Sequence, residues 1–210
     1  MLTSHTVREY AASLASGEPT PGGGSAAALC GALGAALGEM AGNFTVGREK
    51  FAAVDAEVRA ILERLESRRV ALLDLTDADA DAYAQVGAAY SLPRGSDAEK
   101  AARSAAIQEA LKAAAQVPLA VTEACAAIIA DLEELRLKAN PNLLSDVAVS
   151  AEFALAALRC GMLNVDVNLA AIKDPEWVAE KREYIDGLLA GAQPVARGVF
   201  DSIARGLRQS

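Results

Sequence analysis

The chain has 210 residues, of which 52% are hydrophobic and 4% aromatic, and it carries a formal net charge of -8. This length can bury a full core in one domain or in a compact pair of helical layers. The negative charge argues against nucleic acid or an anionic membrane as a partner, because neither would be attracted electrostatically. The single histidine, His5, stands near the N-terminus. A Ser-His-Asp triad, a Cys-His pair and a histidine-bound metal are therefore not expected, and carboxylates, lysines and backbone dipoles must carry any catalysis.

In chain order, we expect helices at 7–14, 25–42, 51–90, 97–116, 118–139, 140–169 and 175–207. The 51–90 stretch is compatible with one long helix or with two abutting helices, and a capping box at Ser96–Glu99 opens the helix that follows it. Pro118 is expected to start a new helix. The chain shows no strand-like alternation, internal repeat or low-complexity linker. These features predict an all-α fold: a single-domain antiparallel bundle of long helices, with residues 1–210 as one domain.

The cysteines and the apolar windows bear on the compartment. Cys30, Cys125 and Cys160 lie in apolar helical surroundings at no metal-like spacing, and we interpret them as small buried hydrophobes in a reducing compartment. The first residues lack the charged and apolar regions of a signal peptide. The most apolar window, 147–169, contains charged residues, which favours a buried helix over a membrane span. We therefore expect a cytoplasmic protein.

A proline- and glycine-rich loop, PTPGGGS at 19–25, leads into an Ala/Leu run. Its prolines and glycines cannot begin a regular element, whereas Ser25 is a good helix N-cap. The glycines of the loop have no side chains that would keep a ligand from the backbone, and the loop leads into the N-terminal, positive end of a helix. A tight connection between two helices explains the same segment and is the more common reading of a lone triple glycine.

Asp79 stands where a core residue is expected. Helical spacing from Leu72 and Leu75 to Tyr83 places it on an apolar face, while its acidic neighbours fall on the solvated side. Burying even a neutral polar group without a partner costs about 2–7 kcal/mol. Function and a buried ion pair explain such a residue equally well at this point.

Several amides and lysines also stand out. Asn142 precedes a helix with Asp146 in its first turn, and capping accounts for both. Asn164 and Asn168 lie one turn apart in an apolar segment, which indicates polar contacts in a cleft or a subunit interface. For Asn168 we favour structural hydrogen bonding. Lys50 lies at a helix edge, where it is a surface charge or meets an acidic ligand.

Together, ordered segments along nearly the whole chain resemble the cyclodeaminase/methenyltetrahydrofolate cyclohydrolase family. This family comprises the C-terminal half of formiminotransferase-cyclodeaminase and stand-alone bacterial relatives. The segments are PGGGSAAA (21–28), NFTVGREKF (43–51), DADAY (79–83), AYSLP (89–93), VPL (117–119), NPNLLSDV (140–147) and LNVDVNL (163–169). The chain departs from the family at Ala139 and Ala148, where relatives often have glycine.

The resemblance implies an all-helical fold, usually a homodimer, that binds a tetrahydrofolate derivative without a metal or other cofactor. It makes Asp79 the catalytic candidate and places the glycine loop and the Lys50 region near the ligand. On this basis, the expected substrate-binding residues are Gly22, Gly23, Gly24, Ser25, Lys50, Asn142, Asp146 and Asn164. The expected partners are the folate substrate and a second copy, with no nucleic acid and no membrane.

The activity we expect is hydrolysis of methenyltetrahydrofolate to formyltetrahydrofolate, with Asp79 as general acid and base. The stand-alone length and the similarity to stand-alone cyclohydrolases favour this reaction. The alternative is formiminotetrahydrofolate cyclodeaminase, which closes the ring with loss of ammonia. A non-catalytic folate-binding or scaffold protein is an alternative of another class.

Overall fold

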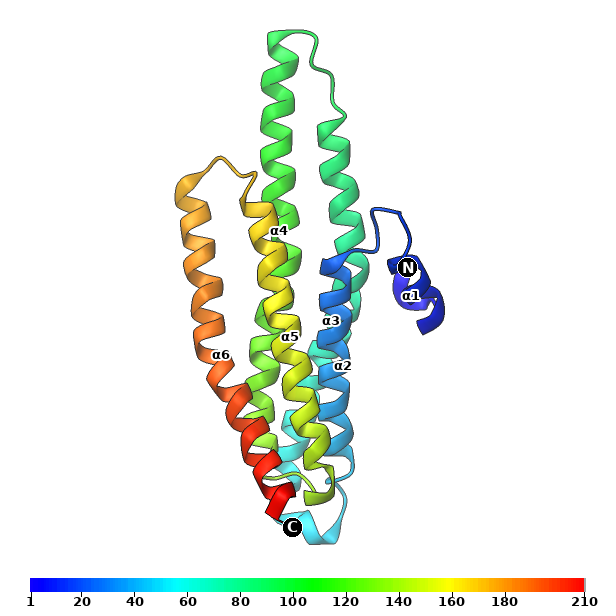
Figure 1. Ribbon diagram of the computed structural model, residues 1–210, viewed down its shortest axis with the longest axis vertical. Coiled ribbons are helices and arrows are strands. Elements are labelled where there is room, and N and C mark those ends of the chain that lie inside the picture. The colour runs from blue at the N-terminus through cyan, green and yellow to red at the C-terminus, as the bar shows by residue number, and fades with distance from the viewer. Residues whose placement is uncertain (210) are drawn as a thin grey trace.

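The computed structural model describes residues 1–209, and their regular elements are all helical. Figure 1 shows the long helices running up and down a tall bundle. The elements are η1 (Leu2–Ser4), α1 (Val7–Leu14), α2 (Gly23–Asn43), η2 (Glu49–Val54), α3 (Asp55–Tyr90), α4 (Asp97–Leu135), η3 (Pro141–Leu143), α5 (Leu144–Leu169) and α6 (Pro175–Gln209). This confirms the predicted all-α bundle of long antiparallel helices.

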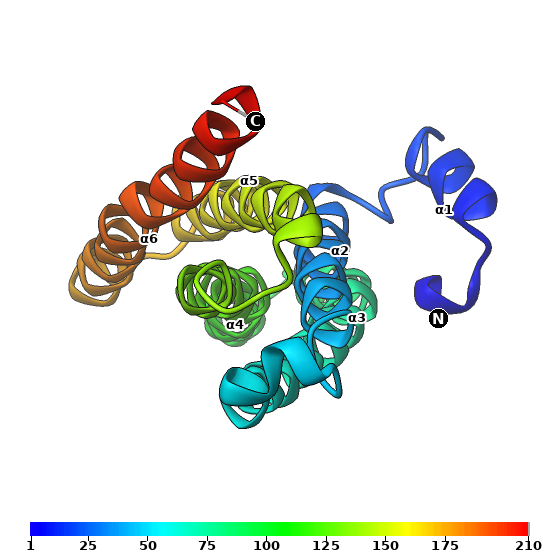
Figure 2. The same ribbon diagram turned by 90° about the horizontal axis from the view of Figure 1, so that it is seen from below.

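Helices α2, α3, α4 and α5 surround the core, and α6 leans against α4 and α5 (Figure 2). Fully buried side chains such as Leu72, Leu132 and Leu158 fill the space between the helices. The glycine stripe of α2 permits a close approach: a Cβ atom on Gly34 would lie 3.2 Å from the backbone nitrogen of Ala154 on α5. Backbone contact of this kind lets two helices pack more closely than side chains would allow.

Two expected helix boundaries are wrong. Helix α4 runs through Pro118 without a break, whereas a new helix was expected to start there. A mid-helix proline costs about 3 kcal/mol, but buried neighbours such as Leu119 and Val121 keep both halves packed in the core. Helix α2 begins at Gly23 with Gly22 as N-cap, so Ser25 lies inside the first turn and is not the cap.

Of the other local expectations, those for the helices are confirmed, whereas two of the three cysteines are less buried than expected. The capping box at Ser96–Glu99 is confirmed, and 55–90 forms one α-helix preceded by a short 3-10 segment. Cys125 is buried as expected, but Cys30 is half-buried and Cys160 is exposed. Cys160 is exposed because no helix within residues 1–209 covers its side of α5.

Helix α1 stands clear of the bundle on the side of α2 (Figure 2). Only Tyr10 of this helix is buried. Within residues 1–209, α2 and α4 are long and apolar enough to cross a membrane by length and composition. About half of the most apolar 18-residue window of each helix (56% and 50%) is buried inside the bundle. A core helix of a soluble bundle has the same properties.

Candidate functional site

A cleft of about 350 Å³ opens where the N-terminus of α2 meets α3 and α5. The glycine loop forms one wall, α3 and α4 form another, and α5 contributes its amides. The lining residues are Pro19, Thr20, Gly22, Gly23, Gly24, Asp79, Ala82, Tyr83, Val86, Leu111, Ala114, Asn164, Val167 and Asn168. The fold thus brings together five of the residues expected at the site: Asp79, Gly22, Gly23, Gly24 and Asn164.

The Asp79 carboxylate lies at the N-terminus of α2. Its Oδ2 atom accepts the backbone N–H of Ser25 at 2.9 Å. Among the described residues, Oδ1 has no hydrogen-bond donor. Burial raises the pKa of Asp79, and the Ser25 hydrogen bond opposes that rise. Asp79 is therefore held through one oxygen, and its pKa is shifted upward, toward neutral pH.

Gly24 is the residue that admits Asp79. A Cβ atom at position 24 would lie 2.7 Å from the Cγ of Asp79, and closer still to Oδ1. Real side chains do not approach that closely, so any residue larger than glycine would displace the carboxylate. The triple glycine thus has a steric role that the sequence alone did not reveal. At Gly23, by contrast, a Cβ atom would only touch the Asn164 amide at 3.7 Å.

Ser25 contributes its backbone rather than its side chain. The hydroxyl is fully buried and forms a 3.0 Å hydrogen bond with the Tyr10 hydroxyl. This contact ties α1 to the start of α2, directly behind the N–H group that holds Asp79. Sequence reasoning missed Tyr10 because it reads as one apolar position of a short amphipathic helix. Ser25 itself does not line the cleft.

The two amides on α5 present acceptors to the cleft. The Asn164 side-chain amide donates to the Cys160 carbonyl oxygen at 2.8 Å, and that of Asn168 donates to the Asn164 carbonyl oxygen at 3.0 Å. Each Oδ1 atom is left to accept from a ligand. Asn168, for which we favoured structural hydrogen bonding, has that bond and also lines the cleft.

Lys50, Asn142 and Asp146 lie at the other end of the bundle. Helix α2 separates the two ends by about 30 Å, from its 21 residues at ~1.5 Å each. Lys50 is exposed, with its ammonium group 5.6 Å from the ring centre of Phe51. The Asn142 N–H donates to the side chain of Asn140. Within one chain, these residues therefore do not meet Asp79.

The face around Asp79 is more open than its periodicity predicts. Leu72 is buried, but Tyr83 and Tyr90 are exposed, because the upper half of α3 extends beyond α2. Asp77, expected on the solvated side, instead accepts hydrogen bonds from Leu2 and from the Thr3 hydroxyl. It therefore holds the N-terminal residues against α3.

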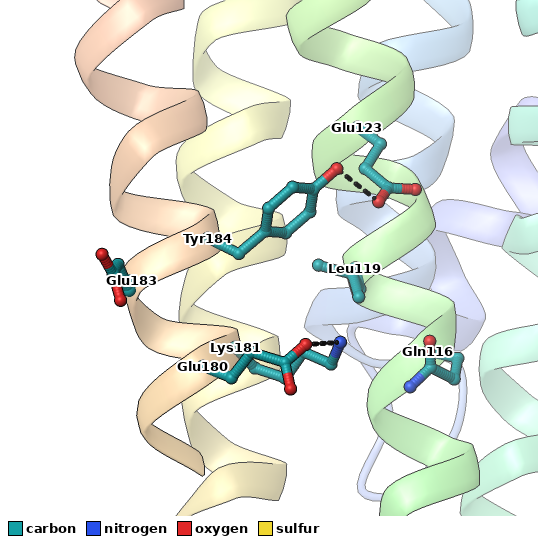
Figure 3. A pocket seen from close by; sticks show the side chains of 7 residues that line it. All are labelled: Gln116, Leu119, Glu123, Glu180, Lys181, Glu183 and Tyr184. Carbon is teal, nitrogen blue, oxygen red and sulfur yellow. Dashed lines mark hydrogen bonds and ion pairs between the residues drawn. The ribbon is translucent and has the colours of Figure 1, made fainter. Parts of the chain in front are cut away.

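Figure 3 shows a different hollow, of about 470 Å³, between α4 and α6. Four of its polar side chains form two pairs: Tyr184 donates to Glu123 at 2.9 Å and Lys181 to Glu180 at 2.8 Å. None of the residues expected at the site lines it. Among residues 1–209, no group of three or more His, Cys, Asp or Glu side chains is arranged to hold a metal ion. The Asp79 cleft is therefore the better candidate.

Known proteins are similar to this chain over most of its length. The family model described as formiminotransferase-cyclodeaminase matches residues 6–187. A methenyltetrahydrofolate cyclohydrolase from Methylorubrum extorquens is 40% identical over 203 residues, covering 97% of this chain and 98% of that protein. The formimidoyltransferase-cyclodeaminase of Sus scrofa is 35% identical over 96% of this chain, which spans 37% of that longer protein.

Among solved structures, the formiminotetrahydrofolate cyclodeaminase of Thermotoga maritima superposes with a TM-score of 0.81 at 29% identity. The match covers 100% of this chain and 98% of the Thermotoga maritima chain. The family model matches most of the sequence, and the cyclohydrolase and the solved structure match this chain over nearly their full lengths. The chain belongs to the formiminotransferase-cyclodeaminase family.

Proposed function

We propose that this protein is a methenyltetrahydrofolate cyclohydrolase that hydrolyses its substrate to formyltetrahydrofolate in the Asp79 cleft. The observation that carries the proposal is a half-buried carboxylate, anchored through Oδ2 and with Oδ1 available, at a cleft walled by bare backbone. The full-length similarity to a cyclohydrolase supports this reaction over others of the family.

The substrate's one-carbon unit is a cationic amidinium carbon between two nitrogens. An ionised Asp79 stabilises that cation in a partly desolvated cleft. Water adds to the carbon, and Asp79 takes one of its protons. The bond from the carbon to the ring nitrogen then breaks as Asp79 returns the proton to that nitrogen. The remaining hydroxyl proton leaves to solvent, and the formyl group stays on the other nitrogen.

The raised pKa of Asp79 suits both steps. A carboxylic acid of ordinary pKa is a weak proton donor near neutrality, whereas a general acid and base works best with a pKa close to the ambient pH. Desolvation by the surrounding apolar residues supplies the shift. The acceptor oxygens of Asn164 and Asn168 are available to the N–H groups of the pterin ring.

A second candidate is the ring closure of formiminotetrahydrofolate with loss of ammonia. The similarity to the Thermotoga maritima cyclodeaminase favours it. There, Asp79 would protonate the leaving nitrogen. We further propose that the protein works as a cytoplasmic homodimer without metal or cofactor. The exposed apolar side chains of α2 and α5 support the dimer, because soluble monomers rarely expose large apolar patches.

The test follows the ultraviolet absorbance of methenyltetrahydrofolate with the purified protein, and ammonia release from formiminotetrahydrofolate in parallel. Asp79→Asn is expected to lower kcat by about 10²- to 10⁴-fold with a smaller change in KM. Asp81→Asn, an exposed carboxylate on the same helix, is the matched control and should keep full activity. An unchanged rate in Asp79→Asn would remove Asp79 from the mechanism. Binding of methenyltetrahydrofolate without turnover would favour a non-catalytic folate-binding protein.

A further inference from the structure

The N-terminal arm, which we define as residues 1–14, contains η1 and α1 and lies beside the bundle rather than within it (Figure 2). Among its residues only Tyr10 is buried. Val7 and Leu14, two other apolar residues of α1, are 88% and 39% exposed. Apart from Tyr10, apolar burial therefore contributes little to holding the arm in place, and its position depends on a few polar contacts.

The first contact joins the arm to the start of α2. The hydroxyl groups of Tyr10 and Ser25 form a hydrogen bond of 3.0 Å, and both residues are buried. Among residues 1–209, this is the one hydrogen bond that either side chain makes. Loss of the phenolic oxygen would therefore leave the Ser25 hydroxyl buried without a partner, which is unfavourable for a polar group.

Ser25 also makes the backbone contact with Asp79. Its N–H group lies in the first turn of α2, where N–H groups have no partner within the helix. The N-cap residue, Gly22, has no side chain that could supply one. The Asp79 carboxylate supplies it from α3, at 2.9 Å. Ser25 therefore links Tyr10 to Asp79, through its hydroxyl on one side and its N–H group on the other.

The second contact joins the arm to α3. Asp77 accepts hydrogen bonds from the Leu2 N–H group and from the Thr3 hydroxyl, and it lies two residues before Asp79. Because an α-helix turns by about 100° per residue, Asp77 and Asp79 leave α3 about 200° apart, on different sides. The arm is therefore attached to both helices that the hydrogen bond between Ser25 and Asp79 joins.

Core packing supports this hydrogen bond from one side only. Two turns before Asp79 in α3, Leu72 is fully buried, and a Cβ atom on Gly31 of α2 would lie 3.2 Å from its side chain. Beyond Asp79, α3 continues to Tyr90, whereas α2 has already reached its N-terminal end (Figure 1). The arm therefore provides a second support at the edge where α2 and α3 part.

Tyr10 and Ser25 lie outside the cleft lining, whereas Asp79 is part of it. A change in the Tyr10 side chain therefore alters no group that lines the cleft. It would instead act on the N–H group that orients the carboxylate. A displacement of a catalytic group by about 1 Å can lower a rate by about 10²-fold. A residue that fixes the donor to Asp79 can thus affect turnover without affecting substrate binding.

We propose that Tyr10 is a positioning residue for the reaction at Asp79, and that the N-terminal arm braces the first turn of α2 against α3. The Tyr10 hydroxyl fixes Ser25, the Ser25 N–H group fixes Oδ2 of Asp79, and Asp77 holds the other end of the arm. The inference rests on the proposed function for its effect on turnover, but the contact between Tyr10 and Ser25 is testable without activity.

Steady-state kinetics with methenyltetrahydrofolate test the effect on turnover. Tyr10→Phe removes only the phenolic oxygen and is expected to lower kcat by about 10- to 10²-fold, with KM within about twofold of the wild-type value. Tyr184→Phe is the matched control: it removes a hydroxyl that also makes one hydrogen bond, to Glu123 between α6 and α4, and it should keep wild-type kcat. A lowered Tm with wild-type kcat in Tyr10→Phe would show a purely structural role and overturn the proposal.

Double variants test whether the effect passes through Ser25 and Asp79. Ser25→Ala removes the hydroxyl and keeps the N–H group, so it should lower kcat as Tyr10→Phe does. The double variant Tyr10→Phe/Ser25→Ala should then lose no more than either single variant, because both remove the same contact. In an Asp79→Asn background, Tyr10→Phe should leave the residual kcat unchanged. Losses that multiply in either combination would show independent effects and overturn the proposal.

Amide hydrogen exchange at Ser25, followed by NMR, tests the contact without turnover. The Ser25 N–H group is expected to exchange about tenfold faster or more in Tyr10→Phe than in the wild type, because the first turn of α2 opens more often. In Tyr184→Phe its exchange should be unchanged. Equal exchange in Tyr10→Phe and the wild type would overturn the proposal. If the wild type shows no turnover, the proposed function fails, while the exchange result still decides whether Tyr10 holds Ser25.

Discussion

Gly24→Ala tests the steric relation between the glycine loop and Asp79. The added Cβ atom would lie 2.7 Å from the Cγ of Asp79, whereas carbon atoms rest at about 3.5–4.0 Å. The carboxylate must therefore move by about 0.8–1.3 Å, or the start of α2 must shift by as much. Either movement breaks the 2.9 Å hydrogen bond from the Ser25 N–H.

The expected result is a large loss of activity with a small loss of stability. A misplacement of about 1 Å in a catalytic group can lower the rate by about 10²-fold. Overpacking costs about 1–3 kcal/mol, and the better helix propensity of alanine returns up to about 1 kcal/mol. The variant should therefore fold while kcat falls by about two orders of magnitude.

Gly23→Ala is the matched control, because its Cβ atom makes only an ordinary 3.7 Å contact with Asn164. Steady-state kinetics and thermal unfolding of both variants, measured together, separate the two effects. Wild-type kcat in Gly24→Ala would refute the reasoning that only glycine admits Asp79. Equal losses in both variants would show that the loop tolerates no substitution for reasons other than this contact.

Three further predictions follow from single contacts. Burial raises the pKa of Asp79. The stabilising contribution of its protonated form is therefore full below the unfolded-state pKa of about 3.9 and is lost as pH rises through the folded-state pKa. Urea unfolding across this pH range should show the wild type losing stability relative to Asp79→Asn, and parallel stability curves would contradict this. Thr45→Val removes a fully buried hydroxyl that accepts the Asn140 N–H at 2.8 Å, and should cost about 1–3 kcal/mol in chemical denaturation; an unchanged midpoint would refute this. Gly161→Ala places a Cβ atom 2.7 Å from the Thr122 hydroxyl and 3.2 Å from the Pro118 carbonyl oxygen of α4. This overpacking should cost about 1–3 kcal/mol of stability and lower Tm, whereas Gly187→Ala, with nothing within 4 Å, should not lower it.

The sequence by itself determined the helices and the unusual residues within them. Helical periodicity is local, so the spacing around Asp79 was enough to identify a carboxylate on an apolar face. Capping is also local, and the Ser96–Glu99 box was read correctly from four residues. The all-α fold class was predictable for the same reason: each helical pattern depends on residues that are close together in the sequence.

Tertiary structure decided what distant segments do to one another. The first turn of α2 is capped by Asp79, 54 residues further along the chain, so the local signal at Ser25 predicted the wrong cap. Helix α4 continues through Pro118 because both sides of the proline pack in the core. Lys50 and Asn142 were grouped with Asp79 by sequence, yet α2 holds them at the opposite end of the bundle. A helix is rigid along its axis, and its length therefore sets which residues of one chain can share a site.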